Sequence, residues 1–218
     1  MKKQLIFVIT LFLGIHSGFA QKMSDLFIQM PDSLVQTLDK MSKTSLIEAW
    51  KDSDGQSASI QNKLGGKSEI KELTDDYLFL QTSAGNSVEI KLLPINEYYR
   101  ILCFVKNGCA PACDGKVSFY TVEWKPLKNN YFTPVSETVF HKTEMSEKCV
   151  SVKESLDMHP IKYSLNKNNL QLTATYSVGA YLNKDDYETL KPCLREICVF
   201  DWVDGRFLNV KEYDNDYN

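Results

Sequence analysis

Four successive segments between Tyr77 and Trp124 alternate apolar and polar residues, and this period of two constrains the fold more than any other feature. β-branched and aromatic side chains are enriched in them, which is typical of strands with one buried face. The links are short, and short links favour antiparallel pairing because parallel neighbours need a crossover of about a dozen residues or more. We therefore predict an antiparallel meander. Its strands are residues 77–82, 87–93, 99–106 and 116–124.

The residues before the meander predict short helices that pack on one face of the sheet. One covers residues 25–29, and a second starts at Pro31 or Ser33, with apolar residues at helical spacing as far as Met41. Ser45 and Glu48 match a capping box for a further short helix. The N-terminal part is thus predicted as a helix-loop-helix.

After the meander, the pattern weakens over residues 126–160 and then returns. Residues 161–165, 170–176 and 196–203 read as strands, and Asp204-Gly205 predicts a tight hairpin. The fold class is α+β, with N-terminal helices on a largely antiparallel sheet. The C-terminal strands either extend that sheet or form a second small one. Residues 21–210 form one domain with a possible subdivision near 126–160, and residues 211–218 form a polar tail.

The first twenty residues have the features of a signal peptide. Lys2 and Lys3 precede an apolar run over residues 5–13, and small residues lead up to Ala20. This run is too short to span about 30 Å of hydrocarbon, and no later stretch is long enough. We expect a soluble periplasmic or secreted protein without a membrane span after cleavage. Acidic residues outnumber basic ones by 28 to 25 and are interspersed with them, which argues against nucleic-acid binding.

All six cysteines follow the predicted cleavage site, and an even number in an exported chain favours disulfides. Cys109 and Cys113 are the candidates for a staple across a short loop. Their spacing does not match the two intervening residues of thioredoxin-like or zinc-binding pairs. The pairing of the other four stays open. These are Cys103, Cys149, Cys193 and Cys198.

The remaining candidates for chemistry are few. His141 and His159 are the two histidines after the signal segment. Together with Glu144 they could form a metal site, which is the weaker alternative to a protein without such a site. Solvated loop histidines are commoner, so we expect no catalytic residues, no cofactor and no metal.

Six segments carry a resemblance to a known family: residues 27–34, 64–70, 73–77, 91–94, 109–114 and 119–124. They resemble a secreted family of Bacteroidales, domain of unknown function DUF3256. The resemblance implies an exported protein and assigns no catalytic residues. The order of a helix-loop-helix and a four-stranded meander also resembles one repeat of the β-lactamase-inhibitor-protein architecture, which favours a binding module.

The sequence therefore predicts a non-catalytic exported protein that binds a protein or envelope component. The contact surface would be a sheet face or the loop over residues 108–115. The competing class is a metal-assisted or cysteine-dependent hydrolase. The identity of the ligand and the oligomeric state stay open.

Overall fold

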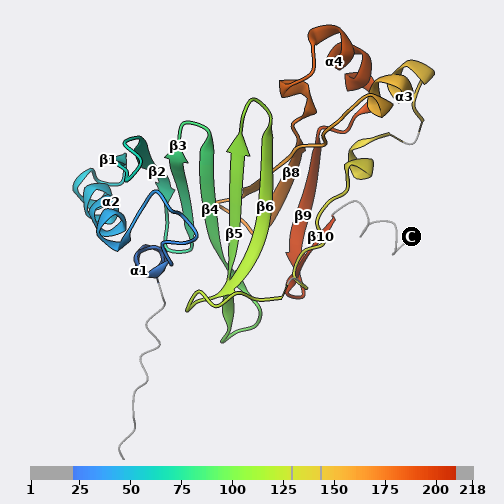
Figure 1. The fold of residues 1–218 in the computed structure, drawn as a ribbon. Helices are drawn as coiled ribbons and strands as arrows, with labels where there is room; N and C mark the ends of the chain where they lie inside the picture. Colours follow the sequence, from blue (N-terminus) through green and yellow to red (C-terminus); the bar gives the residue numbers. More distant parts are fainter. Residues whose placement is uncertain (1–21, 129, 143, 210–218) are drawn as a thin grey trace, which may run out of the picture.

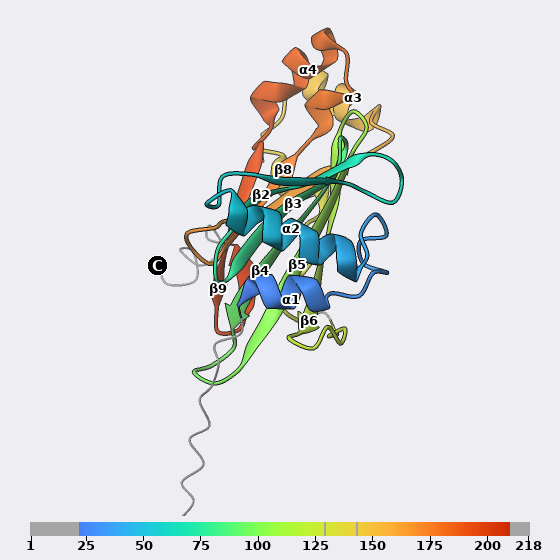
Figure 2. The ribbon, with the colours of Figure 1, turned by 90° about the vertical axis from the view of Figure 1, so that its left-hand side faces the viewer.

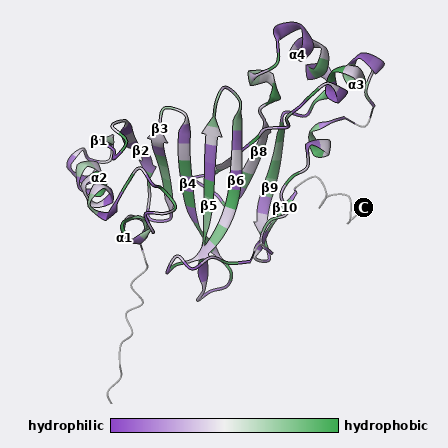
Figure 3. Cartoon of the chain, in the orientation of Figure 1, coloured by the Kyte–Doolittle hydropathy of each residue, from purple (hydrophilic) through white to green (hydrophobic). Residues whose placement is uncertain are grey.

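The first sheet of the computed structural model is the expected meander, extended by two strands at its N-terminal side. The structure describes residues 22–128, 130–142 and 144–209. All neighbours in this sheet are antiparallel, in the order β1-β2-β3-β4-β5-β6. Green and purple residues follow one another along its strands in Figure 3, as the period of two requires. The strands are β1 (Ala58–Gln61), β2 (Lys67–Leu73), β3 (Tyr77–Ser83), β4 (Asn86–Pro94), β5 (Arg100–Cys109) and β6 (Cys113–Thr121).

Two helices, α1 (Met23–Gln29) and α2 (Lys40–Asp52), cross one face of this sheet (Figure 2). The predicted helix from Pro31 or Ser33 to Met41 is wrong, because the residues before Lys40 form turns. Asp39 is the N-cap of α2, since its carboxylate accepts a hydrogen bond of 2.8 Å from the Ser42 N–H. The sequence analysis overlooked this cap. Met41, placed there at the end of the predicted helix, lies in the first turn of α2 and is 79% exposed.

The C-terminal strands form a second sheet of their own, which settles the alternative that the sequence left open. Its order is β10-β9-β8-β7, again antiparallel throughout. The hairpin turn has positive φ at Asp204 (48°) and Gly205 (77°), and Phe207 pairs with Trp202. The strands are β7 (Ile161–Leu165), β8 (Gln171–Tyr176), β9 (Ile197–Val203) and β10 (Arg206–Asn209).

The connection between the sheets begins earlier than expected, because Trp124 has φ of 62° and β6 ends at Thr121. A cluster of short helices lies beyond one end of the second sheet (Figure 1). A disulfide between Cys149 and Cys193 ties two of them together across 44 residues. No helix within the described ranges is long and apolar enough to cross a membrane. The short helices of this half are η1 (Glu137–Phe140), α3 (Glu147–Glu154), η2 (Val178–Ala180), α4 (Lys184–Leu190) and η3 (Lys191–Cys193).

The layers stack as helices, first sheet and second sheet, with a separate core on each face of the first sheet. The helix-side core is built from residues such as Phe27, Leu46 and Leu80. The core between the sheets includes Cys103 and Phe200. Each face of the first sheet is therefore covered over much of its area.

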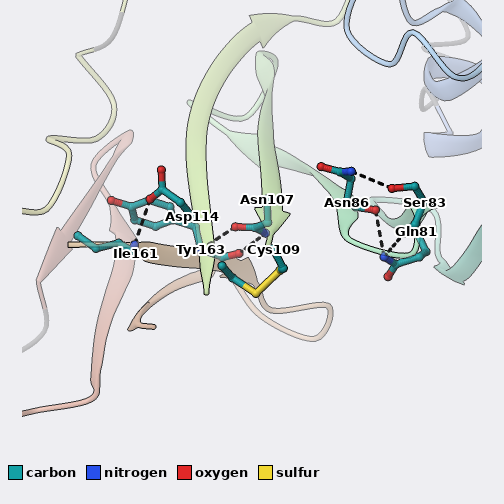
Figure 4. The surroundings of a disulfide bond; sticks show 9 residues. Gln81, Ser83, Asn86, Asn107, Cys109, Asp114, Ile161 and Tyr163 are labelled. Atoms are coloured by element: carbon teal, nitrogen blue, oxygen red, sulfur yellow. Dashed lines mark hydrogen bonds between the residues drawn. A yellow bond between two sulfur atoms is a disulfide. The ribbon is translucent and has the colours of Figure 1, made fainter. Parts of the chain in front are cut away.

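Side chains of the first sheet bind the backbone of β7, the outer strand of the second sheet. Asn107 bonds both backbone groups of Tyr163, at 2.8 and 3.1 Å, and Asp114 accepts from the Ile161 N–H at 3.1 Å (Figure 4). Glu89 accepts from the Leu165 N–H at 2.8 Å, and Lys91 donates to the Lys167 carbonyl at 2.8 Å. The four side chains Asp114, Asn107, Glu89 and Lys91 thus form a polar row along alternate residues of β7 and of the turn that follows it.

Candidate functional site

Cys109 and Cys113, the expected staple, form a disulfide at the tip of the β5–β6 hairpin (Figure 4). Between them Ala110 and Pro111 are exposed. The Cys109 N–H donates to the Gly85 carbonyl at 2.7 Å in the neighbouring β3–β4 turn. A Cβ on Gly85 would lie 2.8 Å from the Cys109 carbonyl oxygen, so glycine permits the close approach of the two tips.

His141 and His159 both contact the ring of Tyr176, a residue that the sequence analysis did not connect with them. His159 Nδ1 lies 2.7 Å from the Tyr176 hydroxyl oxygen, and the His141 ring centroid lies 5.9 Å from that of Tyr176. Burial lowers the pKa of His141 below its usual value of 6.5. Glu144 is exposed on the loop before α3. In the described part of the chain, no group of three or more His, Cys, Asp or Glu side chains could hold a metal.

Cys103 is a buried thiol in the middle of β5. Burial raises the pKa of this thiol well above its usual value, and the Glu89 carboxylate raises it further. A nucleophilic cysteine needs the opposite, a lowered pKa and an accessible sulfur. Cys198 on β9 is half-buried, with its Sγ 4.0 Å from the Val139 carbonyl oxygen. The environment of Cys103 therefore suits packing rather than catalysis.

An open groove of about 360 Å³ lies on the helix side of β5 and β6, where the sheet meets the loop after α1. Ser33 and Leu34 of that loop form one wall, and the two strands form the floor. Its lining residues are Ser33, Leu34, Phe104, Lys106, Asp114, Gly115, Lys116, Ser118 and Tyr120.

Lys106 and Lys116 are direct partners in the β5–β6 ladder, and both side chains are exposed. Because the period of a strand is two, both point to the face that carries the groove. Like charges placed directly opposite each other destabilise a sheet. Within residues 22–209 as described, neither lysine forms an ion pair with a carboxylate. The lining also contains Asp114, whose carboxylate accepts from the Ile161 N–H, so the two lysines leave the groove with a net positive charge in a chain with an acidic excess.

The wall of the groove is held by a buried lysine. Lys43 of α2 is 1% exposed, and its Nζ donates to the Met30 carbonyl at the end of α1 and to the Asp32 carboxylate at 2.9 Å. These contacts fix the chain next to Ser33 and Leu34, since a buried ammonium needs its hydrogen-bond partners. Lys43 thus positions the wall.

The floor of the groove is rigid because its aromatic rings pack on one another. Phe104 meets Tyr120 and Trp124 edge to face, with ring centroids 5.9 and 6.3 Å apart. The Trp124 indole N–H donates to the Leu26 carbonyl at 2.9 Å and so joins this cluster to α1. The sequence analysis did not find the groove above these aromatic rings.

The family model for the protein of unknown function DUF3256 matches residues 15–207. The chain belongs to this family. No curated protein matches it. Among solved structures, it is similar to a domain of an uncharacterized protein from Porphyromonas gingivalis W83, with a TM-score of 0.74 and 23% sequence identity. The alignment covers 85% of this chain and 97% of that domain, which shows that the two share a fold.

Proposed function

We propose that this member of the DUF3256 family is an exported, non-catalytic protein that binds a protein or envelope component through the groove on β5 and β6. The pair Lys106 and Lys116 carries this proposal, because direct lysine partners cost stability and need a reason outside the fold itself. A rigid aromatic floor and a pinned wall also support it, since preorganised sites lose less entropy on binding.

The arrangement of the cysteines and histidines gives less support to the competing hydrolase. A cysteine-dependent hydrolase needs a thiolate next to a base, whereas the Cys103 thiol is buried and its pKa is raised. His159 is hydrogen-bonded to Tyr176, and His141 packs on the same ring. These contacts are those of side chains in a packed cluster.

Charge reversal in the groove tests the binding function. The purified protein is immobilised, and retention of solubilised envelope components from the source cells is compared between wild type and the double variant Lys106→Glu/Lys116→Glu. The matched control, Lys148→Glu/Lys184→Glu, makes the same charge change at exposed positions on α3 and α4. We expect the groove variant to lose retained components that the control keeps. Identical retention by both variants and the wild type would exclude the groove as the binding surface.

Two further measurements test export and the absence of catalysis. Fractionation of expressing cells with N-terminal sequencing should find the protein outside the cytoplasm, beginning at Gln21. Elemental analysis should detect no stoichiometric metal, and His141→Ala and His159→Ala should leave metal content and any activity found by screening unchanged. Loss of a bound metal from either variant would instead support the hypothesis of a metal-assisted hydrolase.

A further inference from the structure

The outer edge of β6 is paired toward the C-terminal end of the strand, at Phe119 and Thr121, and unpaired next to the groove. The Leu127 N–H donates to the Phe119 carbonyl at 2.9 Å, and the Thr121 N–H donates to the Lys125 carbonyl at 2.9 Å. Alternate residues of an antiparallel strand direct their backbone groups to the same edge. Val117 and Gly115 continue this alternation, so their backbone N–H and C=O groups point outward as well.

In the described chain, the backbone groups of Val117 and Gly115 have no partner on that outer edge. The next residue, Asp114, bonds the Ile161 N–H, so the unpaired stretch is short. An edge with unpaired N–H and C=O groups is a template for an additional strand. Proteins use such edges to bind extended peptides, whose backbone gives affinity and whose side chains give specificity.

The side chains beside this edge select the charge of an added strand. Lys116 and Ser118 flank Val117 and point to the groove, whereas Val117 itself points to the core between the sheets. A residue placed opposite Lys116 on an added strand would have its Cβ about 5 Å from that of Lys116. Lys106 lies on β5, the neighbour of β6, within reach of a longer acidic side chain of the added strand.

We propose that the groove takes a short, extended, acidic segment of a partner protein, which adds to the outer edge of β6 as a further strand. Its backbone pairs with Gly115 and Val117, and its carboxylates face Lys116 and Lys106. This inference rests on the proposed function of the groove. A phosphate-bearing envelope polymer would also meet the lysines, but it has no row of alternating N–H and C=O groups to match the edge.

The test uses synthetic probes with the full mature chain. The first probe is an end-capped peptide that alternates glutamate and valine, and the second replaces each glutamate by lysine. A third probe is the acidic peptide with methyl groups on alternate backbone nitrogens, prepared in both phases so that one phase blocks edge pairing. We expect binding of the acidic peptide, slowed hydrogen exchange at the Gly115 and Val117 amides, and about tenfold weaker binding of one methylated phase.

Protein variants separate the charge from the edge. Lys116→Glu should weaken binding of the acidic peptide by about tenfold, with high salt reducing the difference. Val117→Pro removes the outward N–H at an edge position, where proline is tolerated, and should also weaken binding. Because it replaces a valine of the core between the sheets as well, Val117→Ala, which keeps the N–H, is the matched control. If this variant does not fold, as judged by circular dichroism, the methylated peptides still decide the matter.

The outcomes distinguish this inference from the function on which it rests. If dextran sulfate binds, and both methylated phases bind as well as the parent peptide, the groove is a polyanion site and strand addition is wrong. If the lysine peptide binds as well as the acidic one, the proposed charge selection is wrong. If the charge-reversed groove variant also retains envelope components like the wild type, the proposed function itself fails.

Discussion

The two faces of the first sheet are covered in different ways, and the difference follows from what each covering layer does with its own backbone. The helix side is mainly apolar beneath α1 and α2. The opposite face buries Glu89, Lys91 and Asn107, which are 5%, 2% and 1% exposed. A helix bonds its own N–H and C=O groups, so an apolar surface can receive it. The outer strand β7 presents unpaired groups, and the sheet must supply partners for them.

The comparison teaches that the buried polar residues are matched to a backbone rather than to one another. Each member of the polar row reaches an N–H or C=O group of the β7 segment, at residues 161, 163, 165 and 167. Tyr77 adds a hydrogen bond of 3.0 Å to Glu89, and Asp76 an ion pair of 3.0 Å to Lys91. Changes on the two faces should therefore have different signatures.

The largest loss is expected on the helix side from Leu80→Ala. Leu80 is fully buried, and removing its side chain should cost about 2–5 kcal/mol of unfolding free energy through lost burial and a cavity. The measurement is urea unfolding, with Leu64→Ala, at a position 79% exposed, as the control. Equal losses for the two variants would contradict the assignment of the helix-side core.

Asn107→Ala should cost roughly 2–4 kcal/mol, because it leaves the N–H and C=O groups of Tyr163 buried without partners. Unlike Leu80→Ala, it should also speed hydrogen exchange of the Tyr163 amide beyond the global change. The exposed Asn168→Ala serves as the control. If the Tyr163 amide keeps its protection relative to the rest of the chain, side-chain pairing of β7 is wrong.

Gly115→Ala should cost about 1–3 kcal/mol by a related route. A Cβ at this position would lie 2.2 Å from Asn107 Oδ1, so the asparagine would have to leave Tyr163. The cost should shrink in an Asn107→Ala background, which a double-mutant cycle measures. Additive losses would mean that Gly115 does not act through Asn107.

Glu89→Gln should give an effect that depends on pH. Burial raises the pKa of the Glu89 carboxyl above its usual 4.5, although the Leu165 N–H, the Tyr77 hydroxyl and Lys162 oppose this. Wild-type stability is therefore full below pH 4.5 and falls as the pH rises through the raised pKa. The glutamine lacks this loss, so the stability of the variant relative to wild type should increase as the pH rises from 4.5 to 7.5.

Unfolding curves at several pH values test this, with the exposed Glu123→Gln as the control. A constant difference between Glu89→Gln and wild type across the range would show that the pKa of Glu89 is not raised in the folded protein.

The meander could be predicted from sequence because its signal is local. Alternation within β3 to β6 gives both the strands and their buried positions, and short turns give the antiparallel order. The start of α2 was missed because Val35 and Leu38, which are buried, and Leu34, which is partly buried, stand at helical spacing in a chain of turns. Burial of Val35 and Leu38 comes from the loop folding over the sheet, and periodicity alone cannot separate that from a helix.

The groove could be predicted only in part. The stapled hairpin places Lys106 opposite Lys116, and this register can be counted from Cys109 and Cys113. The part of the β5–β6 surface that stays uncovered cannot be predicted in this way, because it depends on where the loop after α1 ends. That position is set by the buried contacts of Lys43, which pair residues 13 and 11 positions apart. The separate second sheet was undecided for the same reason, since only contacts distant in the chain specify it.

The polar row also has a consequence for the order in which the protein assembles. Meander contacts are near in sequence and form early, whereas β7 lies more than 50 residues beyond Asn107 and arrives late. During that interval Glu89, Lys91 and Asn107 keep water on a face that would otherwise be a bare apolar surface. A stray apolar segment cannot replace that water, because it brings no backbone edge in the right register. The same side chains that receive β7 thus protect the unfinished molecule from its neighbours.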